Sequence, residues 1–236
     1  GEHCAKAGLI SIHHVNAVGH VGNAAPYRGS DARFTTNPYC CTIPRARESE
    51  PMVLDMATTV MAHGKVRVAR NKGDRLPEGV LLDGQGQPTT DPNAVFSEPF
   101  GALRPMGTYK GYGLALANEL LAGILSGGGT CRPETHHNND TILNNMFSVI
   151  LDPKRFSGAD FFKSELDLTV EHVTSSPPMD PSEPVLIPGD PERANASRRK
   201  AKGVPIDENS WGLVLNSAES VGLTSNQITG LAHIVH

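Results

Sequence analysis

The chain has 236 residues, of which 38% are hydrophobic and 19% charged, a composition that excludes a disordered or fibrous protein. It is long enough for one large domain or two small ones. The formal net charge of −4 gives no basic surface for nucleic acid. No apolar run approaches the roughly 20 residues that cross a bilayer, and no secretory signal precedes the first segment. We therefore expect a cytoplasmic protein without nucleic-acid or membrane partners.

The cysteines and histidines do not form a recognisable metal motif. Cys4, Cys40, Cys41 and Cys131 have neither zinc-ribbon spacing nor the density of a disulfide framework, so we expect reduced thiols. Adjacent histidines on a strand diverge, and no HExxH pattern is present. We predict no metal site.

The first residues resemble the end of a helix that leads directly into a strand at residues 8–16. A domain rarely begins in this way. We therefore expect that the chain is truncated or processed and that elements preceding Gly1 are missing.

Strands and helices then alternate. After a Gly- and Pro-rich loop at 17–38, apolar segments predict strands at 39–44, 51–57 and 144–153. Thr58 or Thr59 can cap a helix that contains Val60, Met61, Ala62, Val66 and Val68. Residues 112–125 are apolar nearly all round, which predicts a helix buried on most faces and ended by the glycines of 126–129. Three further helices are expected within 159–176, 192–206 and 210–223. This alternation indicates an α/β architecture.

Asp55 is the first candidate ligand-binding residue. It is expected at the carboxyl end of a short strand and directly before a helix, where ligands bind in open α/β sheets. Its carboxylate can accept hydrogen bonds from ribose hydroxyls, while free N–H groups at a helix start attract phosphate. From position alone, simple capping of the helix is the more favoured interpretation.

Two further segments suggest a ligand. Lys110 lies among glycines at the start of the apolar helix, where a cation is locally unfavourable and a bound anion would explain it; a tight turn with a solvated lysine explains it equally well. Asn37 precedes Pro38, which predicts an extended conformation that aims the amide at a partner. An ordinary Asx-turn is the alternative. His20, in a Gly-rich loop, is a further candidate for a general acid or base.

Five segments, taken in order, are more specific than any of them alone. They are VNAVGHVGNAAPYRGSDARFTTNPYCCTIPR, PMVLDMATTVMAHGKV, LLDGQGQPTTDP, LRPMGTYKGYGLALANELLAGILSGG and NNMFSVILDP. Together they resemble the malate/L-lactate dehydrogenase family, from about residue 8 to about residue 222. No GxGxxG follows a strand, so an ordinary Rossmann fold is not supported.

This resemblance implies a sulfolactate dehydrogenase-like α/β fold with a mixed sheet, a homodimer, and NADH or NADPH bound near the subunit interface. It implies a central NAD(P)-binding domain at 1–153 and a C-terminal helical segment at 154–236 that packs with the absent N-terminal region. The implied cofactor-binding residues are Asn16, Thr36, Asn37, Asp55, Met56, Ala57, Thr58, Gly107, Lys110 and Gly111.

The chain departs from the family pattern at two positions within its sequence. Thr35 stands where the family usually has Gly, and Tyr109 where it often has His. The family's catalytic histidine, in an SHG motif, and a second histidine, in NHFG, are expected upstream of residue 1. The catalytic residue is therefore unknown within this chain, and we expect the fragment alone to be inactive.

The resemblance favours an oxidoreductase that moves a hydride between nicotinamide and a 2-hydroxy or 2-oxo acid. A noncatalytic dinucleotide-binding or dimerisation remnant is an alternative, and so is a cyclic-imine reductase of the same fold. The presence of SHG and NHFG in the encoded upstream sequence would separate the first two.

Overall fold

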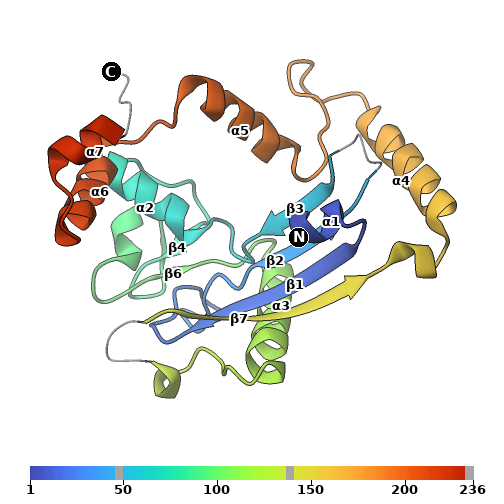
Figure 1. Cartoon of the computed structure of the whole chain (residues 1–236). Helices are drawn as coiled ribbons and strands as arrows, with labels where there is room; N and C mark the ends of the chain where they lie inside the picture. The colour runs from blue at the N-terminus through green and yellow to red at the C-terminus, as the bar shows by residue number, and fades with distance from the viewer. Residues whose placement is uncertain (46–49, 137–140, 232–236) are drawn as a thin grey trace.

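The computed structural model describes residues 1–45, 50–136 and 141–231, and its centre is a sheet of four strands (Figure 1). The strand order is β3-β2-β1-β7, and neighbouring strands run antiparallel. Parallel pairing in the described residues occurs in isolated bridges, such as that of Ala24 with Leu103. The strands are β1 (Ile10–Val18), β2 (Tyr39–Ile43), β3 (Met52–Met56) and β7 (Leu143–Leu151).

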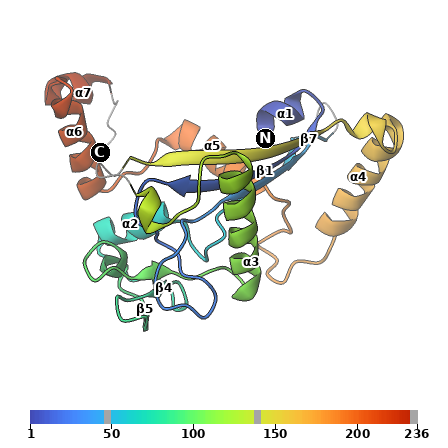
Figure 2. The same ribbon diagram turned by 90° about the horizontal axis from the view of Figure 1, so that it is seen from below.

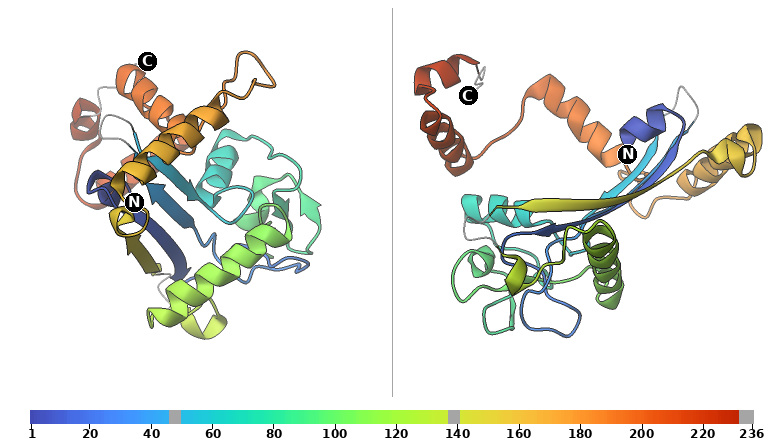
Figure 3. Two further views of the ribbon diagram at one scale, coloured as in Figure 1. Left: turned by 90° about the vertical axis from the view of Figure 1, so that its right-hand side faces the viewer. Right: turned by 60° about the horizontal axis from the view of Figure 1, so that its bottom comes forward.

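The two faces of this sheet carry different helices. Helix α3 (Tyr109–Asn118) continues into a π-helical segment, η2 (Glu119–Leu125), and lies below the sheet in Figure 2. His14 of β1 faces α3, because its Nδ1 is 2.7 Å from Asn118 Oδ1. The short helix α1 (Glu2–Lys6) lies on the opposite face (Figure 3). Since side chains alternate along a strand, His13 points to the face that α1 covers.

A second layer of the fold surrounds a compact apolar core. A three-stranded sheet, β5-β4-β6, packs with helix α2 through buried Val66, Leu81 and Leu103. Leu81 and Leu103 are paired across β4 and β6 and are fully buried. The elements are α2 (His63–Lys72), β4 (Leu81–Leu82), β5 (Pro88–Thr89), η1 (Pro92–Val95) and β6 (Ala102–Leu103). The short 3-10 helix η3 (Pro133–Thr135) follows η2 in the chain.

The C-terminal helices lie around the edge of the molecule (Figure 1). The helices α4, α5 and α6 bury none of their residues. The accessible surface of 15199 Å² exceeds the roughly 10,000 Å² expected for a compact monomer of this mass. No described helix is both long and apolar enough to cross a membrane. The elements are η4 (Pro153–Arg155), α4 (Ala159–Thr174), α5 (Asp190–Lys202), α6 (Glu208–Ser220) and α7 (Ser225–Leu231).

The α/β class and most of the predicted elements are confirmed, including all four strands of the main sheet. The predicted cap of α2 is wrong: the helix begins at His63 after Ala62. Thr58 and Thr59 instead donate their hydroxyls to the carbonyls of Thr36 and Met61. Residues 57–62 therefore separate the end of β3 from α2.

The prediction that residues 112–125 are buried on most faces is also wrong. Leu120, Ile124 and Leu125 are 46%, 61% and 62% exposed, whereas the buried stripe consists of small or polar residues. A helix that turns its small residues to the sheet and its large apolar residues outward has the same sequence pattern as a helix buried on most faces. The pattern does not show which side meets the sheet. The short helix α7 was not predicted.

Candidate functional site

A cavity of about 570 Å³ opens between the end of β1 and the start of α2. The apolar part of its lining, here called the apolar wall, includes Val21, Val95, Phe100 and Ile142. Mostly apolar walls with a few convergent polar groups are typical of ligand sites. The polar groups here fall into two sets, one near β1 and one on α2.

The set on α2 is basic. His63 and Arg67 lie one turn apart on the same helix face, and both line the cavity together with His20. Burial lowers the pKa of His63, and the nearby positive charges of Arg67 and His20 lower it further. Arg67 forms none of the ion pairs found between described residues. A guanidinium beside neutral imidazole suits a carboxylate or phosphate group.

The polar residues that line the cavity at the β1 end are uncharged; they are Thr35, Thr36, Asn144 and Asn16. Behind it lies a buried carboxylate, Glu119, which is 4% exposed. Glu119 Oε1 accepts hydrogen bonds from Asn16 Nδ2 at 3.1 Å and the backbone N–H of Cys131 at 2.5 Å. Its Oε2 accepts from Asn37 Nδ2 at 2.6 Å.

The amide groups around Glu119 are fully engaged. Asn37 Nδ2 also donates to Ala115 O, while Asn37 Oδ1 accepts from the Thr35 hydroxyl. Asn16 Nδ2 also donates to Gly129 O, while Asn16 Oδ1 accepts from Asn145 Nδ2. Both side chains are fully buried. Neither side chain has a free amide group for a ligand. Both instead hold the floor of the cavity in place.

Asn37 does not have the predicted extended conformation. Its φ is 31°, in the left-handed region that Asn tolerates better than most residues. This turn directs the amide inward to Glu119, and Asn118 Nδ2 donates to Asn37 O and Pro38 O on the other side. The preference imposed by Pro38 is overridden because the buried amide groups need these partners.

The predicted cofactor-binding residues separate into groups in the structure. Asn16 and Thr36 line the cavity. Thr58 is buried beside them, and both its N–H and its hydroxyl donate to Thr36 O. Met106 N donates to Thr58 O, which brings the loop before α3 against this segment. Gly111 is buried at the same junction.

Asp55 and Lys110 do not line either described cavity. Asp55 pairs with Cys40, which pairs with His13, so its exposed side chain lies on the sheet face opposite α3. Lys110 is an exposed residue in the first turn of α3, and Gly107 is exposed before it. Met56 and Ala57 are half-buried. The expectation that Asp55 directly precedes a helix is wrong, since β3 continues to Met56.

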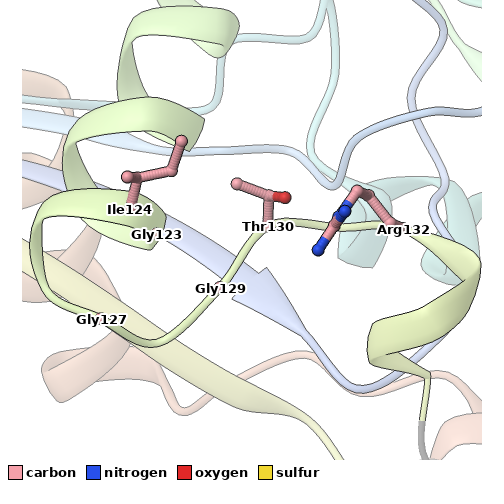
Figure 4. Close-up of a pocket in the computed structure, with 6 residues that line it drawn as sticks. All are labelled: Gly123, Ile124, Gly127, Gly129, Thr130 and Arg132. Carbon is pink, nitrogen blue, oxygen red and sulfur yellow. The ribbon is translucent and has the colours of Figure 1, made fainter.

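A second cavity, of about 390 Å³, lies at the end of η2 (Figure 4). Three glycines, Ile124 and Thr130 line it, and Arg132 is its one charged residue. The described residues contain no group of three potential metal ligands, and the four cysteines are free thiols. The first cavity is larger and is lined by more polar side chains than the second, so it is the stronger candidate site.

Sequence reasoning missed His63, Arg67 and Glu119. Glu119 had a visible signal, since it is the one charged residue within the apolar stretch 112–125. His63 and Arg67 had none, because nothing in their spacing distinguishes a cavity-lining helix face from a solvated one.

The main antiparallel sheet is backed by a helix that ends in a π-helical segment, and the cleft is basic at one end. These features define an α/β protein outside the Rossmann class, with a cleft that suits an anionic ligand. The malate/L-lactate dehydrogenase family model matches residues 1–214. The chain belongs to this family, and its fold is sulfolactate dehydrogenase-like.

Three relatives show the extent of the similarity. Hydroxycarboxylate dehydrogenase B of Escherichia coli (strain K12) is 41% identical over 223 residues, which are 94% of this chain and 61% of the relative. The solved sulfolactate dehydrogenase of Methanocaldococcus jannaschii is 32% identical with a TM-score of 0.71, covering 94% of this chain and 62% of that one. The solved delta1-piperideine-2-carboxylate reductase of Pseudomonas syringae pv. tomato is 30% identical with a TM-score of 0.71, covering 89% and 60%. The chain thus spans about three fifths of the length of these relatives.

Proposed function

We propose that the protein is an NAD(P)-dependent oxidoreductase that interconverts a 2-oxo acid and a 2-hydroxy acid. The observation that carries this proposal is the cleft between β1 and α2, which combines an apolar wall with Arg67 at one end. Relatives that share the fold include hydroxycarboxylate and sulfolactate dehydrogenases. An anionic dinucleotide and an anionic substrate both suit such a cleft.

The residues of this chain fit a nicotinamide nucleotide by chemistry. Arg67 and His63 would hold a phosphate group, while the apolar wall at Val21, Phe100 and Ile142 would exclude water from a flat ring. When bound, the reduced cofactor supplies a hydride to the carbonyl carbon of the 2-oxo acid. The carbonyl oxygen would take its proton from the SHG-motif histidine that the family resemblance places upstream of residue 1, so that a 2-hydroxy acid would result.

Several finer assignments are part of this proposal. Asn16, Thr36, Asn37 and Thr58 would shape the floor of the cleft, with Asn37 and Thr58 acting from buried positions. Asp55, Met56, Ala57, Gly107, Lys110 and Gly111 remain predicted cofactor-binding residues. The C-terminal helices would pack on segments outside this chain, and we propose a cytoplasmic homodimer.

An imine reductase is the second candidate, since the Pseudomonas syringae reductase has the same fold. A cyclic imine that carries a carboxylate would use the same basic end of the cleft. The two activities differ in the group that accepts the hydride, a C=N bond instead of a C=O bond.

A substrate panel tests the function. The natural protein should oxidise NADH or NADPH when supplied with 2-oxo acids, and absorbance of the reduced nicotinamide follows the reaction. Cyclic imino acids in the same panel test the second candidate. If neither cofactor binds and no substrate is reduced, the protein is a noncatalytic member of the family.

Arg67→Ala should weaken binding of the dinucleotide about tenfold, because a guanidinium that contacts phosphate would contribute on the order of 1.4 kcal/mol. Arg70→Ala is the matched control. Arg67 and Arg70 lie on α2, and their guanidinium groups stack on Phe96 at 5.8 and 4.8 Å. Arg70 does not line the cavity.

Fluorescence titration of the two arginine variants with NADH and NADPH measures the difference. Equal affinities in the two variants would remove Arg67 from the cofactor site. A larger loss for NADPH than for NADH would indicate that Arg67 contacts the additional phosphate.

A further inference from the structure

Glu119 is the one charged residue among the buried polar residues described. It begins the π-helical segment η2, and single π-helical turns are frequent at functional sites. Burial of a carboxylate away from water costs several kcal/mol unless it has partners. Such a residue therefore needs an explanation beyond the packing of an apolar helix.

The partners of Glu119 satisfy its hydrogen bonds but do not neutralise its charge. The three donors are the amides of Asn16 and Asn37 and the backbone N–H of Cys131. All three donate to the carboxylate oxygens, and none of the three carries a positive charge. None of the ion pairs between described residues involves Glu119.

The pKa of the Cys131 thiol is shifted by the same buried surroundings. Burial raises its pKa to about 11, and the charge of Glu119 contributes to the increase. The thiol is therefore neutral at physiological pH and supplies no thiolate. Glu119 is thus the one acidic side chain of this buried region among the described residues.

One side chain separates this charge from the candidate cleft. Asn16 donates to Glu119 Oε1 and also lines the cavity. The guanidinium of Arg67, the one Lys or Arg side chain of the lining, lies at the α2 end of the same cavity. The cleft therefore has a negative end at β1 and a positive end at α2, and a ligand with separated charges would be oriented by them.

We propose that Glu119 stabilises the oxidised, positively charged nicotinamide ring at the β1 end of this cleft. The inference rests on the proposed function. Glu119 acts across Asn16, so it is a positioning residue and not a catalytic one. The ring is neutral before hydride transfer and carries one positive charge after it. A fixed negative charge nearby therefore favours transfer from the cofactor to the substrate.

The test compares binding of the oxidised and reduced cofactors to the natural protein and two variants. Glu119→Gln removes the charge and keeps the size of the side chain, whereas Glu119→Asp keeps the charge. In Glu119→Gln the ratio of the dissociation constants, oxidised over reduced, should rise about tenfold. In Glu119→Asp it should stay within about threefold of the natural value, even if both affinities fall.

A purely structural role would weaken both cofactors equally in Glu119→Gln and leave the ratio unchanged, which would overturn the inference. If the natural protein binds neither cofactor, the proposed function itself fails. If it binds both and only the ratio is insensitive to Glu119, the proposed function stands without this inference. Isothermal titration calorimetry distinguishes these results without an activity assay.

A second pair of variants covers the case in which Glu119→Gln does not fold. Asn144 is an exposed residue that lines the same cavity, so Asn144→Asp and Asn144→Lys leave the buried network intact. The ratio should fall in the first and rise in the second. Equal ratios in the two would show that no charged ring lies at this end of the cleft, which also overturns the inference.

Discussion

Asn37→Ala should destabilise the protein by about 3 kcal/mol. Asn37 is fully buried, and its amide donates to the Glu119 carboxylate at 2.6 Å and to Ala115 O at 3.0 Å. Truncation leaves both acceptors without this donor in a region that water does not reach. It also removes the acceptor of the Thr35 hydroxyl. Chemical denaturation followed by circular dichroism gives the change in the free energy of unfolding.

Two further variants make this result specific. Asn195→Ala removes an exposed Asn that bonds Arg198 on α5, and it should change the free energy of unfolding by less than about 0.5 kcal/mol. Asn37→Asp should be worse than Asn37→Ala, because it places a second carboxylate against Glu119. If Asn37→Ala cost no more than Asn195→Ala, the buried network would not be a determinant of stability.

The main sheet could be predicted from sequence because its strands have local signals. Residues 39–44 and 144–153 are short apolar or β-tolerant runs bounded by proline or by an Asp-Pro turn, and such runs have few other solutions. The faces of α3 and η2 could not be predicted. A helix that is apolar nearly all round does not reveal whether its large or its small residues meet the sheet.

The candidate cleft could be predicted only in part. The family resemblance implies Asn16 and Thr36 as cofactor-binding residues, which stays a prediction, and both line the cavity. Arg67 could not be identified as a site residue from the sequence, because its place in the cavity depends on where α2 begins and on which face of α2 is turned to β1. The inward turn of Asn37 was missed because it is set by Glu119 and Asn118, which lie about 80 residues away in the chain. Contacts of this range leave no local pattern.

Gly111→Ala should be among the most disruptive single substitutions in the chain, with a cost of about 3 kcal/mol or more. A Cβ atom at Gly111 would lie 2.5 Å from both Met106 O and Thr58 O. Both atoms are backbone, so relief requires α3 to move away from the segment that carries Thr58. That segment bonds Thr36 O, so the displacement would reach the floor of the cleft.

Gly113→Ala is the matched control because it lies on the same helix with nothing within 4 Å of the added methyl group. There the substitution should stabilise the protein by about 0.5–1 kcal/mol, since alanine is the better helix former. Thermal unfolding of the two variants separates the explanations for Gly111. A stable Gly111→Ala variant with weakened cofactor binding would mean that the glycine serves the ligand directly. If Gly111→Ala loses stability and Gly113→Ala does not, Gly111 is needed for the close approach of α3 to the segment that carries Thr58. Cofactor binding would then fall only because the floor of the cleft is displaced.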